Sequence, residues 1–225
     1  MKHFCIDIDN TVACSDKIMR RVISTYSSGR VQLKYDDIVT FNYYECLDRR
    51  GNHITEKEWK EIHVLWSERK NVMSIQPMPG AVDALRRLAK YGTIHLATSR
   101  LRVARAATAE WLDSHDFPDH ELHFLKHGKK HSSLRSFAAA VEDYYEQAVD
   151  FAALGTPSFL IRHPWNQDRE PVDGVQWVEN WEELIEYLMD ITHTRRRGKP
   201  NKKVPDANSK SRSDGRIMKR QAPQK

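Results

Sequence analysis

The stretch HFCIDIDNTVA, residues 3–13, decides the fold of this chain. Its first half is apolar and partly β-branched, which predicts a short buried strand. Asp7 and Asp9 follow at the end of that strand, and because strand side chains alternate between two faces, they point the same way if the strand continues. Two carboxylates that close repel each other, and a divalent cation such as Mg²⁺, which prefers carboxylate oxygens, is the usual remedy.

This acidic pair has two interpretations. A carboxylate beside a metal ion can attack phosphorus, while a second carboxylate carries a proton to and from the leaving oxygen. Alternatively, the strand simply runs into an Asp/Asn turn, because these residues favour turns and helix caps. The stretch alone leaves both interpretations open.

Length and composition bound the class of protein. A chain of 225 residues with 40% hydrophobic residues can form one core, with room for a smaller subdomain. It has no apolar run of about 18 residues, the length that spans a membrane, and no small-residue cleavage site after its N-terminal strand, so we expect neither a membrane partner nor a signal peptide. Cys5, Cys14 and Cys46 form no CxxC pair, which is typical of a reduced, cytoplasmic protein.

The net charge of +5 is unevenly distributed along the chain. Residues 194–225 contain twelve Lys and Arg against two acidic residues and have almost nothing apolar to bury, so we expect a disordered basic tail on an acidic body. Such a tail can contact nucleic-acid phosphates nonspecifically, or it can serve only as a solubilising extension. It contains no aromatic residue, which weakens the case for base stacking.

After the first strand and its acidic pair, the body alternates between strand-like and helix-like segments. Further strands are expected at 93–97, 123–125, 138–141 and 158–161, with helices at 81–90, 104–114, 132–137 and 145–153. Strands separated by helices predict an α/β fold with a doubly wound parallel sheet, whose ligands bind at the carboxyl ends of the strands. Residues 15–75 form a separate stretch with helices expected at 15–26 and 55–69, the second with a capped start.

Polar side chains of complementary chemistry follow the predicted strands. Thr98 and Ser99 follow the second, where a hydroxyl and the amides that open the next helix can hold a phosphate. Glu142 and Asp143 follow the fourth and offer oxygens to a cation. The segment 126–130 supplies lysines that can offset negative charge. Each piece also fits a helix cap or an exposed loop, but their order along the chain favours a single site.

Four motifs resemble those of the haloacid dehalogenase superfamily of phosphohydrolases, namely Asp7-x-Asp9-x-Thr11, Thr98 after an apolar strand, a lysine, and Glu142-Asp143. Residues 77–81, 107–112, 141–148 and 164–167 resemble the deoxyribonucleotidase-like branch of cytosolic type C, so the likeness covers about residues 3–190. The resemblance implies a Rossmann-like core at 1–13 and 78–193, a small helical cap at 14–77 inserted after the first strand, and Mg²⁺ as cofactor.

The resemblance also implies roles for the motif residues. Asp7 would be the nucleophile that becomes an aspartyl-phosphate, and Asp9 the general acid and base. Mg²⁺ would be held by Asp7, the backbone carbonyl of Asp9 and Asp143, with Glu142 as a neighbouring or alternate ligand. Many relatives have Asp-Asp where this chain has Glu-Asp, which leaves the exact ligand open. Thr98 would bind the phosphoryl group.

Further residues are expected near the phosphate. Lys130 matches the family's catalytic lysine best because it opens the helix before the fourth strand, but Lys126 and Lys129 also fit. Ser99, Arg100 and Thr11 complete the set of expected contacts to the substrate's phosphate.

Aromatic residues of the expected cap are candidates to bind a base. Phe41, Tyr43 and Tyr44 could stack on it, because aromatic faces bind bases with little sequence preference. They could equally pack the cap's own core against Trp59 and Trp66. A small closed cap favours a small phosphomonoester, and the resemblance suggests a 5′-nucleotide or deoxynucleotide.

Two other classes of function remain to be weighed. A polynucleotide-end phosphatase would use the basic tail to reach DNA or RNA termini. A non-enzymatic nucleic-acid-binding protein could retain a phosphatase fold without its activity, but the intact set Asp7, Asp9, Thr98 and Asp143 argues against it.

Overall fold

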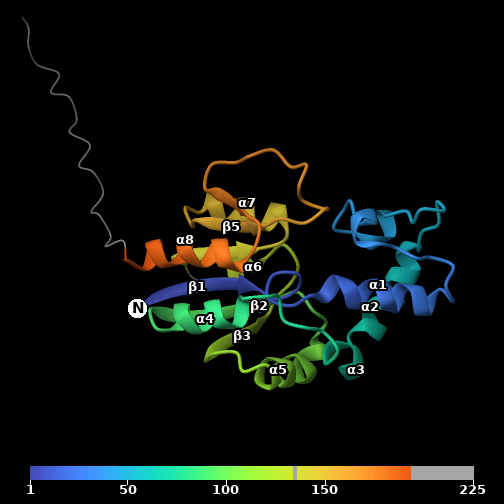
Figure 1. The fold of residues 1–225 in the computed structure, drawn as a ribbon, viewed down its shortest axis with the longest axis horizontal. Helices are drawn as coiled ribbons and strands as arrows, with labels where there is room; N and C mark the ends of the chain where they lie inside the picture. Colours follow the sequence, from blue (N-terminus) through green and yellow to red (C-terminus); the bar gives the residue numbers. More distant parts are fainter. Residues whose placement is uncertain (134–135, 194–225) are drawn as a thin grey trace, which may run out of the picture. The chain divides into compact units, whose positions relative to one another are not determined.

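A six-stranded parallel sheet forms the centre of the computed structural model, which describes residues 1–133 and 136–193. The strands are β1 (Lys2–Asp7), β2 (Gly92–Thr98), β3 (His120–Phe124), β4 (Ala139–Glu142), β5 (Ser158–Ile161) and β6 (Val175–Val178). Their order is β3-β2-β1-β4-β5-β6, and every adjacent pair is parallel. The predicted α/β fold class is confirmed (Figure 1). The expected basic tail, 194–225, lies outside the described residues.

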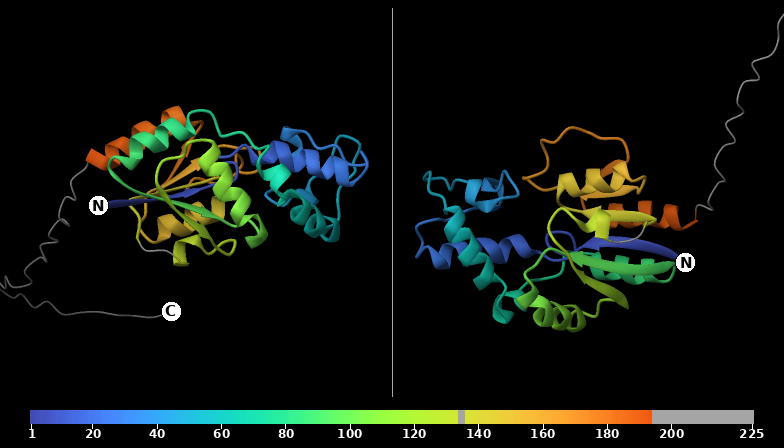
Figure 2. Two further views of the ribbon diagram at one scale, coloured as in Figure 1. Left: turned by 90° about the horizontal axis from the view of Figure 1, so that it is seen from below. Right: turned by 180° about the vertical axis from the view of Figure 1, so that it is seen from behind.

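Helices cover both faces of the sheet. Helices α4 (Ala81–Ala89) and α8 (Trp181–His193) lie side by side, α4 against β2 and α8 against β6 (Figure 2). Helix α7 (Tyr145–Ala153) packs on β4 and β5 from the opposite side. Helix α5 (Arg105–Ser114), preceded by the short turn η3 (Arg102–Ala104), connects β2 to β3, and α6 (Lys130–Ser133) connects β3 to β4.

Hydrophobic spacing explains the central packing. In α4 the buried residues Ala81, Ala84, Leu85 and Leu88 recur at the spacing of one helix face. They join one core cluster with Phe4 and other apolar residues of β1 and β2. Alternate residues of β1 point to the other face, where a second, smaller cluster contains Phe151 of α7. Both faces of the central strands are therefore buried, as parallel sheets require.

The register of the parallel strands gathers their carboxyl ends at one edge of the sheet. Asp7, the last residue of β1, pairs with Ala97 of β2, which places Thr98 beside it. Ile6 pairs with Val141 of β4, which places Glu142 beside the acidic motif from the other side. Residues separated by more than 90 positions in sequence therefore meet around the end of β1.

A helical segment is inserted between β1 and α4. It comprises α1 (Ser15–Tyr26), η1 (Tyr35–Asp37), η2 (Tyr43–Glu45), α2 (Glu56–Trp66) and α3 (Arg69–Val72). The chain leaves and returns through a β-bridge between Ala13 and Pro77, flanked by backbone hydrogen bonds from Cys14 to Gln76 and from Met78 to Val12. This narrow connection agrees with a cap at 14–77, although Met1–Thr194 forms one compact unit and the division stays a prediction.

The individual elements agree with expectation to different degrees. The predicted helices at 15–26 and 145–153 and the strand at 158–161 have the bounds that were expected, and α2 begins with the expected capping box of Thr55 and Glu58. The third strand is displaced to His120–Phe124, because its polar side chains hide the strand pattern. The helical turn expected at 132–137 is confirmed only at Ser132 and Ser133, which lie in the single turn α6; residues 136–137 are not helical, and residues 134–135 lie outside the described residues. Strand β6 and helix α8 were not predicted.

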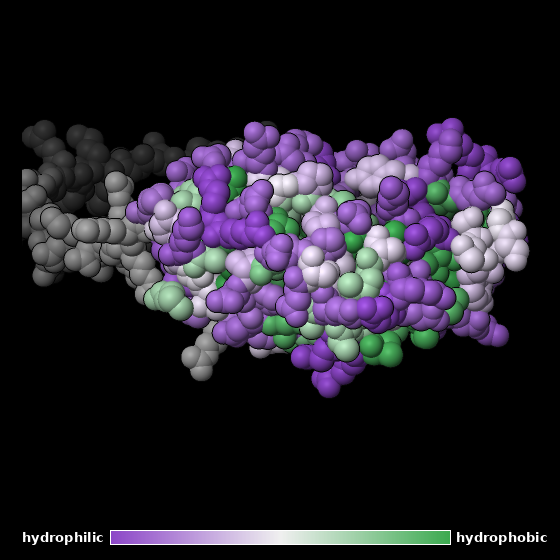
Figure 3. Space-filling model, turned by 60° about the horizontal axis from the view of Figure 1, so that its bottom comes forward, coloured by the Kyte–Doolittle hydropathy of each residue, from purple (hydrophilic) through white to green (hydrophobic). Residues whose placement is uncertain are grey.

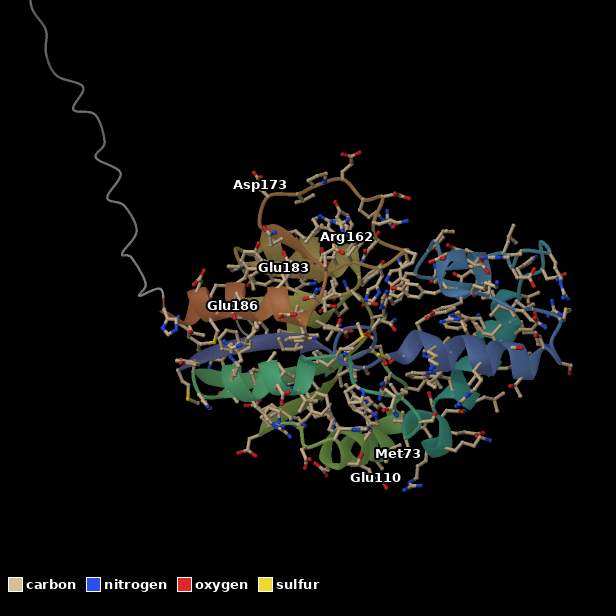
Figure 4. All side chains as sticks on the ribbon, viewed as in Figure 1. Met73, Glu110, Arg162, Asp173, Glu183 and Glu186 are labelled. Atoms are coloured by element: carbon tan, nitrogen blue, oxygen red, sulfur yellow. The ribbon has the colours of Figure 1, made fainter. Side chains whose placement is uncertain are left out.

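Ion pairs connect elements at the surface. Arg69 of α3 donates to Glu110 of α5, and Arg87 of α4 pairs with Glu186 of α8 at 3.4 Å. Figure 4 labels the two glutamates of these pairs, Glu110 on α5 and Glu186 on α8. Such exposed pairs stabilise little individually. On the face that Figure 3 shows, hydrophobic residues form small patches between hydrophilic ones. Among the described helices, none combines the length and apolar character needed to cross a membrane.

Candidate active site

Asp7 ends β1 and lies almost fully buried at the floor of a cavity. Its carboxylate contacts the ammonium of Lys130 and accepts a hydrogen bond of 3.4 Å from the Thr11 hydroxyl. Burial raises the pKa of Asp7; the Lys130 charge opposes this shift, and the neighbouring charge of Asp9 adds to it. The ion pair with Lys130 favours the ionised form that a nucleophile requires.

Glu142 and Asp143 face Asp7 from the end of β4. Carboxylate oxygens of these three buried residues lie within 4.8 Å of one another. The ammonium of Lys130 also donates to both oxygens of Glu142, at 2.9 and 3.1 Å. The side-chain amide of Asn10 donates to Asp143 at 3.3 Å. The predicted metal ligands therefore converge at the end of the sheet.

The charges of this cluster do not balance by themselves. Three buried carboxylates face the single ammonium of Lys130, which leaves an excess of two negative charges. Burial, opposed by Lys130, raises the pKa of Glu142 to about 8; burial together with the charges of Asp7 and Glu142 holds the pKa of Asp143 well above its ordinary value. One divalent cation would neutralise the excess, and carboxylate oxygens are ligands for hard cations. The residues present thus fit a hard divalent metal.

Asp9 is held separately, by Arg100. The guanidinium donates to both oxygens of the carboxylate, with Nη2–Oδ1 at 2.7 Å and Nε–Oδ2 at 3.0 Å. The Thr98 hydroxyl donates to Oδ2 at 3.3 Å, and Ser15 donates to Oδ1. Burial works to raise the pKa of Asp9, but the charge and hydrogen bonds of Arg100 outweigh it, so the pKa is lowered.

Arg100 has its donors directed at protein groups. Besides Asp9, it donates to the Thr108 hydroxyl at 3.0 Å, and its guanidinium lies 5.1 Å from the ring centre of Trp66. Its side chain is fully buried, although the residue also lines the cavity. We interpret it as the residue that positions Asp9, and the phosphate contact expected from the sequence stays a prediction.

The other expected phosphate contacts divide into two groups. Ser99 and Lys130 line the cavity. Thr98 is fully buried beside Asp9. Thr11 is fully buried behind Asp7, where its backbone carbonyl accepts a hydrogen bond from the Trp181 indole, and it is not among the lining residues. Lys126 and Lys129 are exposed, so of the three lysines only Lys130 reaches the carboxylates.

A cavity of about 260 Å³ opens above these groups, with an aromatic wall from the inserted segment. Tyr43 stacks on Trp59, with ring centres 5.3 Å apart, and its hydroxyl donates to Asp16 at 3.0 Å. Phe41 stacks on His127 at 5.0 Å and contacts Tyr144 at 4.5 Å. Tyr43 therefore packs within the inserted segment, as one interpretation expected, while Phe41 reaches residues that flank β4.

Two features of the site were not anticipated from the sequence. The indole nitrogen of Trp66 is buried without a hydrogen-bond partner among the described residues, and Trp66 lines the cavity. A second feature joins Tyr35 to the acidic loop: its hydroxyl lies 2.7 Å from Nδ1 of His163, whose Nε2 donates to the Asn10 carbonyl at 2.7 Å. Neither feature has a local sequence signal, because each depends on contacts between distant segments.

Comparison with known families decides the identity of this arrangement. The model of the family described as 5′ nucleotidase, deoxy (Pyrimidine), cytosolic type C protein matches residues 3–193. The chain belongs to this family. The comparison with curated proteins gave no match.

Solved structures of haloacid dehalogenase-type hydrolases share the fold of this cytosolic type C family member. A haloacid dehalogenase-like hydrolase from Streptococcus pneumoniae has 14% identity and a TM-score of 0.59, covering 83% of this chain and 98% of its own. CbbY from Rhodobacter sphaeroides, solved in complex with phosphate, has 15% identity and a TM-score of 0.55, covering 82% and 96%. A family IA hydrolase from Entamoeba histolytica has 13% identity and a TM-score of 0.54, covering 86% and 100%.

Membership of the family makes this protein an enzyme of the phosphatase and nucleotidase class. The resemblance inferred from the four motifs is therefore confirmed, as is the haloacid dehalogenase-like sheet. At the end of the sheet, Asp7, Glu142 and Asp143 form an acidic cluster that could hold a metal ion.

Proposed function

We propose that this enzyme is a Mg²⁺-dependent phosphomonoester hydrolase that forms an aspartyl-phosphate on Asp7 and acts on a 5′-nucleotide or deoxynucleotide. The observation that carries the proposal is the position of Asp7. It is paired with Lys130, lies within 4.8 Å of the other two carboxylates of the cluster, and shares its cavity with Asp9. A nucleophile, a cation site and a second titratable carboxylate are thereby assembled around one space.

The carboxylates have two proposed roles: some bind the metal ion, and one holds the charged side chain of Lys130 in place. Asp7, Asp143 and the backbone carbonyl of Asp9 would hold Mg²⁺, while Glu142, which accepts two hydrogen bonds from Lys130, anchors that lysine. When bound, Mg²⁺ would offset the negative charge shared by the cluster and the substrate's phosphate. With Glu142 engaged by Lys130, we propose it only as an alternate ligand for Mg²⁺.

In the first step a carboxylate oxygen of Asp7 attacks phosphorus. A new Asp7–phosphorus bond forms, the ester bond to the alcohol breaks, and the leaving oxygen takes a proton from Asp9. Lys130 holds Asp7 in its ionised form, and Ser99, which lines the cavity, receives the phosphoryl oxygens. The dianionic phosphate disfavours a neighbouring carboxylate, so its arrival supports protonation of Asp9, whose pKa is low in the free enzyme.

In the second step Asp9, now ionised, takes a proton from water. The resulting hydroxide attacks phosphorus, the bond to Asp7 breaks and restores the Asp7 carboxylate, and inorganic phosphate leaves, while Asp9 keeps the proton from water as it did at the start of the first step. The hydrogen bonds from Arg100 to both oxygens of Asp9 keep it in one orientation for both transfers.

The remainder of the cavity supports a nucleotide as substrate. Its wall carries the rings of Phe41, Tyr43, Trp59 and Trp66, and aromatic faces are good partners for a base. The free indole donor of Trp66 adds a hydrogen-bond donor for a polar group of the substrate.

The alternative functions receive no comparable support. A polynucleotide-end phosphatase depends on residues 194–225, which lie outside the described residues, and the matched family is one of nucleotidases. The non-enzymatic interpretation fails because the chain belongs to an enzyme family. A cytoplasmic location remains a prediction, in keeping with three free cysteines and the word cytosolic in the family's description.

A panel of phosphorylated substrates tests the proposal. With Mg²⁺, the enzyme should hydrolyse 5′-nucleotides or deoxynucleotides faster than sugar phosphates and faster than oligonucleotides with terminal phosphates. Chelation of Mg²⁺ should abolish the activity. Preference for phosphorylated oligonucleotides, lost on removal of residues 194–225, would instead establish the polynucleotide-end phosphatase.

A further inference from the structure

A cluster of histidines lies on the sheet away from the acidic site. His3 of β1, His95 of β2 and His123 of β3 stand in a diagonal row across three adjacent strands, with Glu121 of β3 beside them. Strand alternation places His3 and His95 on the face opposite to Phe4, which packs in the main core. None of these four residues lines the catalytic cavity.

Three of these side chains converge on one point. Nδ1 of His95 lies 3.1 Å from Nε2 of His123, and Oε2 of Glu121 lies 3.4 Å from the first nitrogen and 3.6 Å from the second. A tetrahedral ion with ligand bonds of about 2.0–2.1 Å has ligand atoms about 3.3 Å apart. The observed triangle therefore has the dimensions of one face of a tetrahedral metal site.

The contact between His95 and His3 supports the same arrangement. Nε2 of His95 lies 2.9 Å from Nδ1 of His3, so a proton on that nitrogen donates to His3 and leaves Nδ1 of His95 free to bind a metal. Ligating histidines commonly donate their second ring nitrogen in this way. Burial lowers the pKa of both His95 and His123, which keeps the imidazoles neutral at ordinary pH.

We propose that His95, Glu121 and His123 form a second metal site, specific for a borderline divalent transition metal such as Zn²⁺. Two imidazole nitrogens and one carboxylate oxygen form a typical zinc donor set, and Mg²⁺ prefers oxygen ligands. Glu121 is exposed and His123 is only partly buried, so the fourth position opens to solvent. Binding would tie β2 to the edge strand β3 through their side chains.

The positive charge of Arg105 lies near enough to lower the pKa of His123, and it disfavours a cation at this site. Its guanidinium is stacked over Phe124, with its central carbon 5.0 Å from the ring centre, and Glu121 supplies an opposing negative charge. The site therefore has a ligand of each kind that a divalent ion needs, neutral nitrogen and anionic oxygen.

Metal titration of the metal-stripped full-length chain tests this site independently of catalysis. Excess Mg²⁺ occupies the acidic cluster, Zn²⁺ is titrated against a chromophoric chelator, and Co²⁺ serves as a spectroscopic probe of tetrahedral geometry. Wild type should bind one tight Zn²⁺ that His123→Gln and Glu121→Gln each weaken at least about 100-fold, and His3→Phe about 10-fold. Zn²⁺ should also raise the melting temperature of wild type but not of these variants.

The matched control is His120→Gln, on the same strand, where the imidazole donates to the Pro118 carbonyl at 2.8 Å instead of joining the cluster. It should bind Zn²⁺ as wild type does. Because Glu121 is exposed, Glu121→Gln leaves core packing intact and remains informative even where His123→Gln misfolds. Equal Zn²⁺ affinity in wild type and Glu121→Gln, or no tight Zn²⁺ binding by wild type, would overturn the proposal.

Discussion

Arg100 donates to both carboxylate oxygens of Asp9, with Nη2–Oδ1 at 2.7 Å and Nε–Oδ2 at 3.0 Å, and its guanidinium is fully buried. A planar fork of this kind fixes the orientation of a carboxylate, which a lysine ammonium cannot do. The same pairing lowers the pKa of Asp9 and so determines when it can hold a proton. The second carboxylate of the motif is therefore controlled by a residue that lies 91 positions away.

Replacing Arg100 tests whether it positions Asp9. Arg100→Lys keeps the charge but loses the two-pronged contact, so we expect kcat to fall roughly 10- to 100-fold. The pKa of Asp9 should rise because it loses hydrogen bonds that favour its ionised form, so the limb of the pH–rate profile that Asp9 controls should move to higher pH. Arg105→Lys, which changes an exposed residue on the next turn, is the control and should leave both unchanged. An unshifted pH profile in Arg100→Lys would assign Arg100 a purely structural role.

Substitution of Asp7 and substitution of Asp9 should impair catalysis in different ways. Asp7→Asn should abolish turnover and phosphoenzyme formation, because an amide is not a useful nucleophile for phosphorus. Asp9→Asn should still bind Mg²⁺ through its unchanged backbone carbonyl but lose about 10²- to 10⁴-fold in rate. Single-turnover assays of both variants, with BeF₃⁻ as a phosphoryl mimic on wild type, measure the difference. Near-normal activity of Asp7→Asn on every substrate would disprove the nucleophile assignment.

The acidic cluster makes stability depend on pH in the absence of metal. Burial raises the pKa of Glu142 to about 8, against about 4.3 for an unfolded chain. Between these values the folded state holds a proton that the unfolded state has lost, so the free energy of unfolding should fall as pH rises, by at most about 1.4 kcal/mol per pH unit. Mg²⁺ binds the deprotonated cluster, so its stabilising effect should grow with pH.

Urea unfolding with and without Mg²⁺ at several pH values from about 5 to about 8.5, which cover most of the range between the two pKa values, measures this dependence. Glu142→Gln removes the titrating group and keeps its shape, so the Mg²⁺-free slope in this range should flatten. A slope that is equal in wild type and Glu142→Gln would show that another group titrates.

Trp66 offers a test of substrate contact. Trp66→Phe removes an indole N–H that is buried without a partner among the described residues, and it keeps an aromatic ring under the Arg100 guanidinium. We expect KM for the preferred nucleotide to rise about 3- to 10-fold, the value of one neutral hydrogen bond, with kcat little changed. Trp177→Phe, which alters β6 outside the cavity, is the matched control. An unchanged KM would show that the substrate leaves this donor unused.

Local pattern was sufficient for much of the fold and for part of the site. The helix at 145–153 and the strand at 158–161 were predicted with their observed bounds, because apolar periodicity reports burial directly. Strand β3 was displaced because Glu121 and His123 lie on a sheet face where the polar cluster replaces an apolar core, and His120 on the other face adds a third polar side chain. Helix α8 was missed although Trp181 and Leu184 begin a regular apolar face.

By itself the sequence determined the α/β alternation, the acidic pair after the first strand and the types of side chain that could hold a phosphate. Only the tertiary structure decided which lysine contacts Asp7, which basic residue neutralises Asp9 and which histidines lie together on β2 and β3. The physical reason is the strand order, in which β1 lies between β2 and β4. That order brings residues from distant segments within hydrogen-bond reach, and periodicity within any one segment carries no record of it.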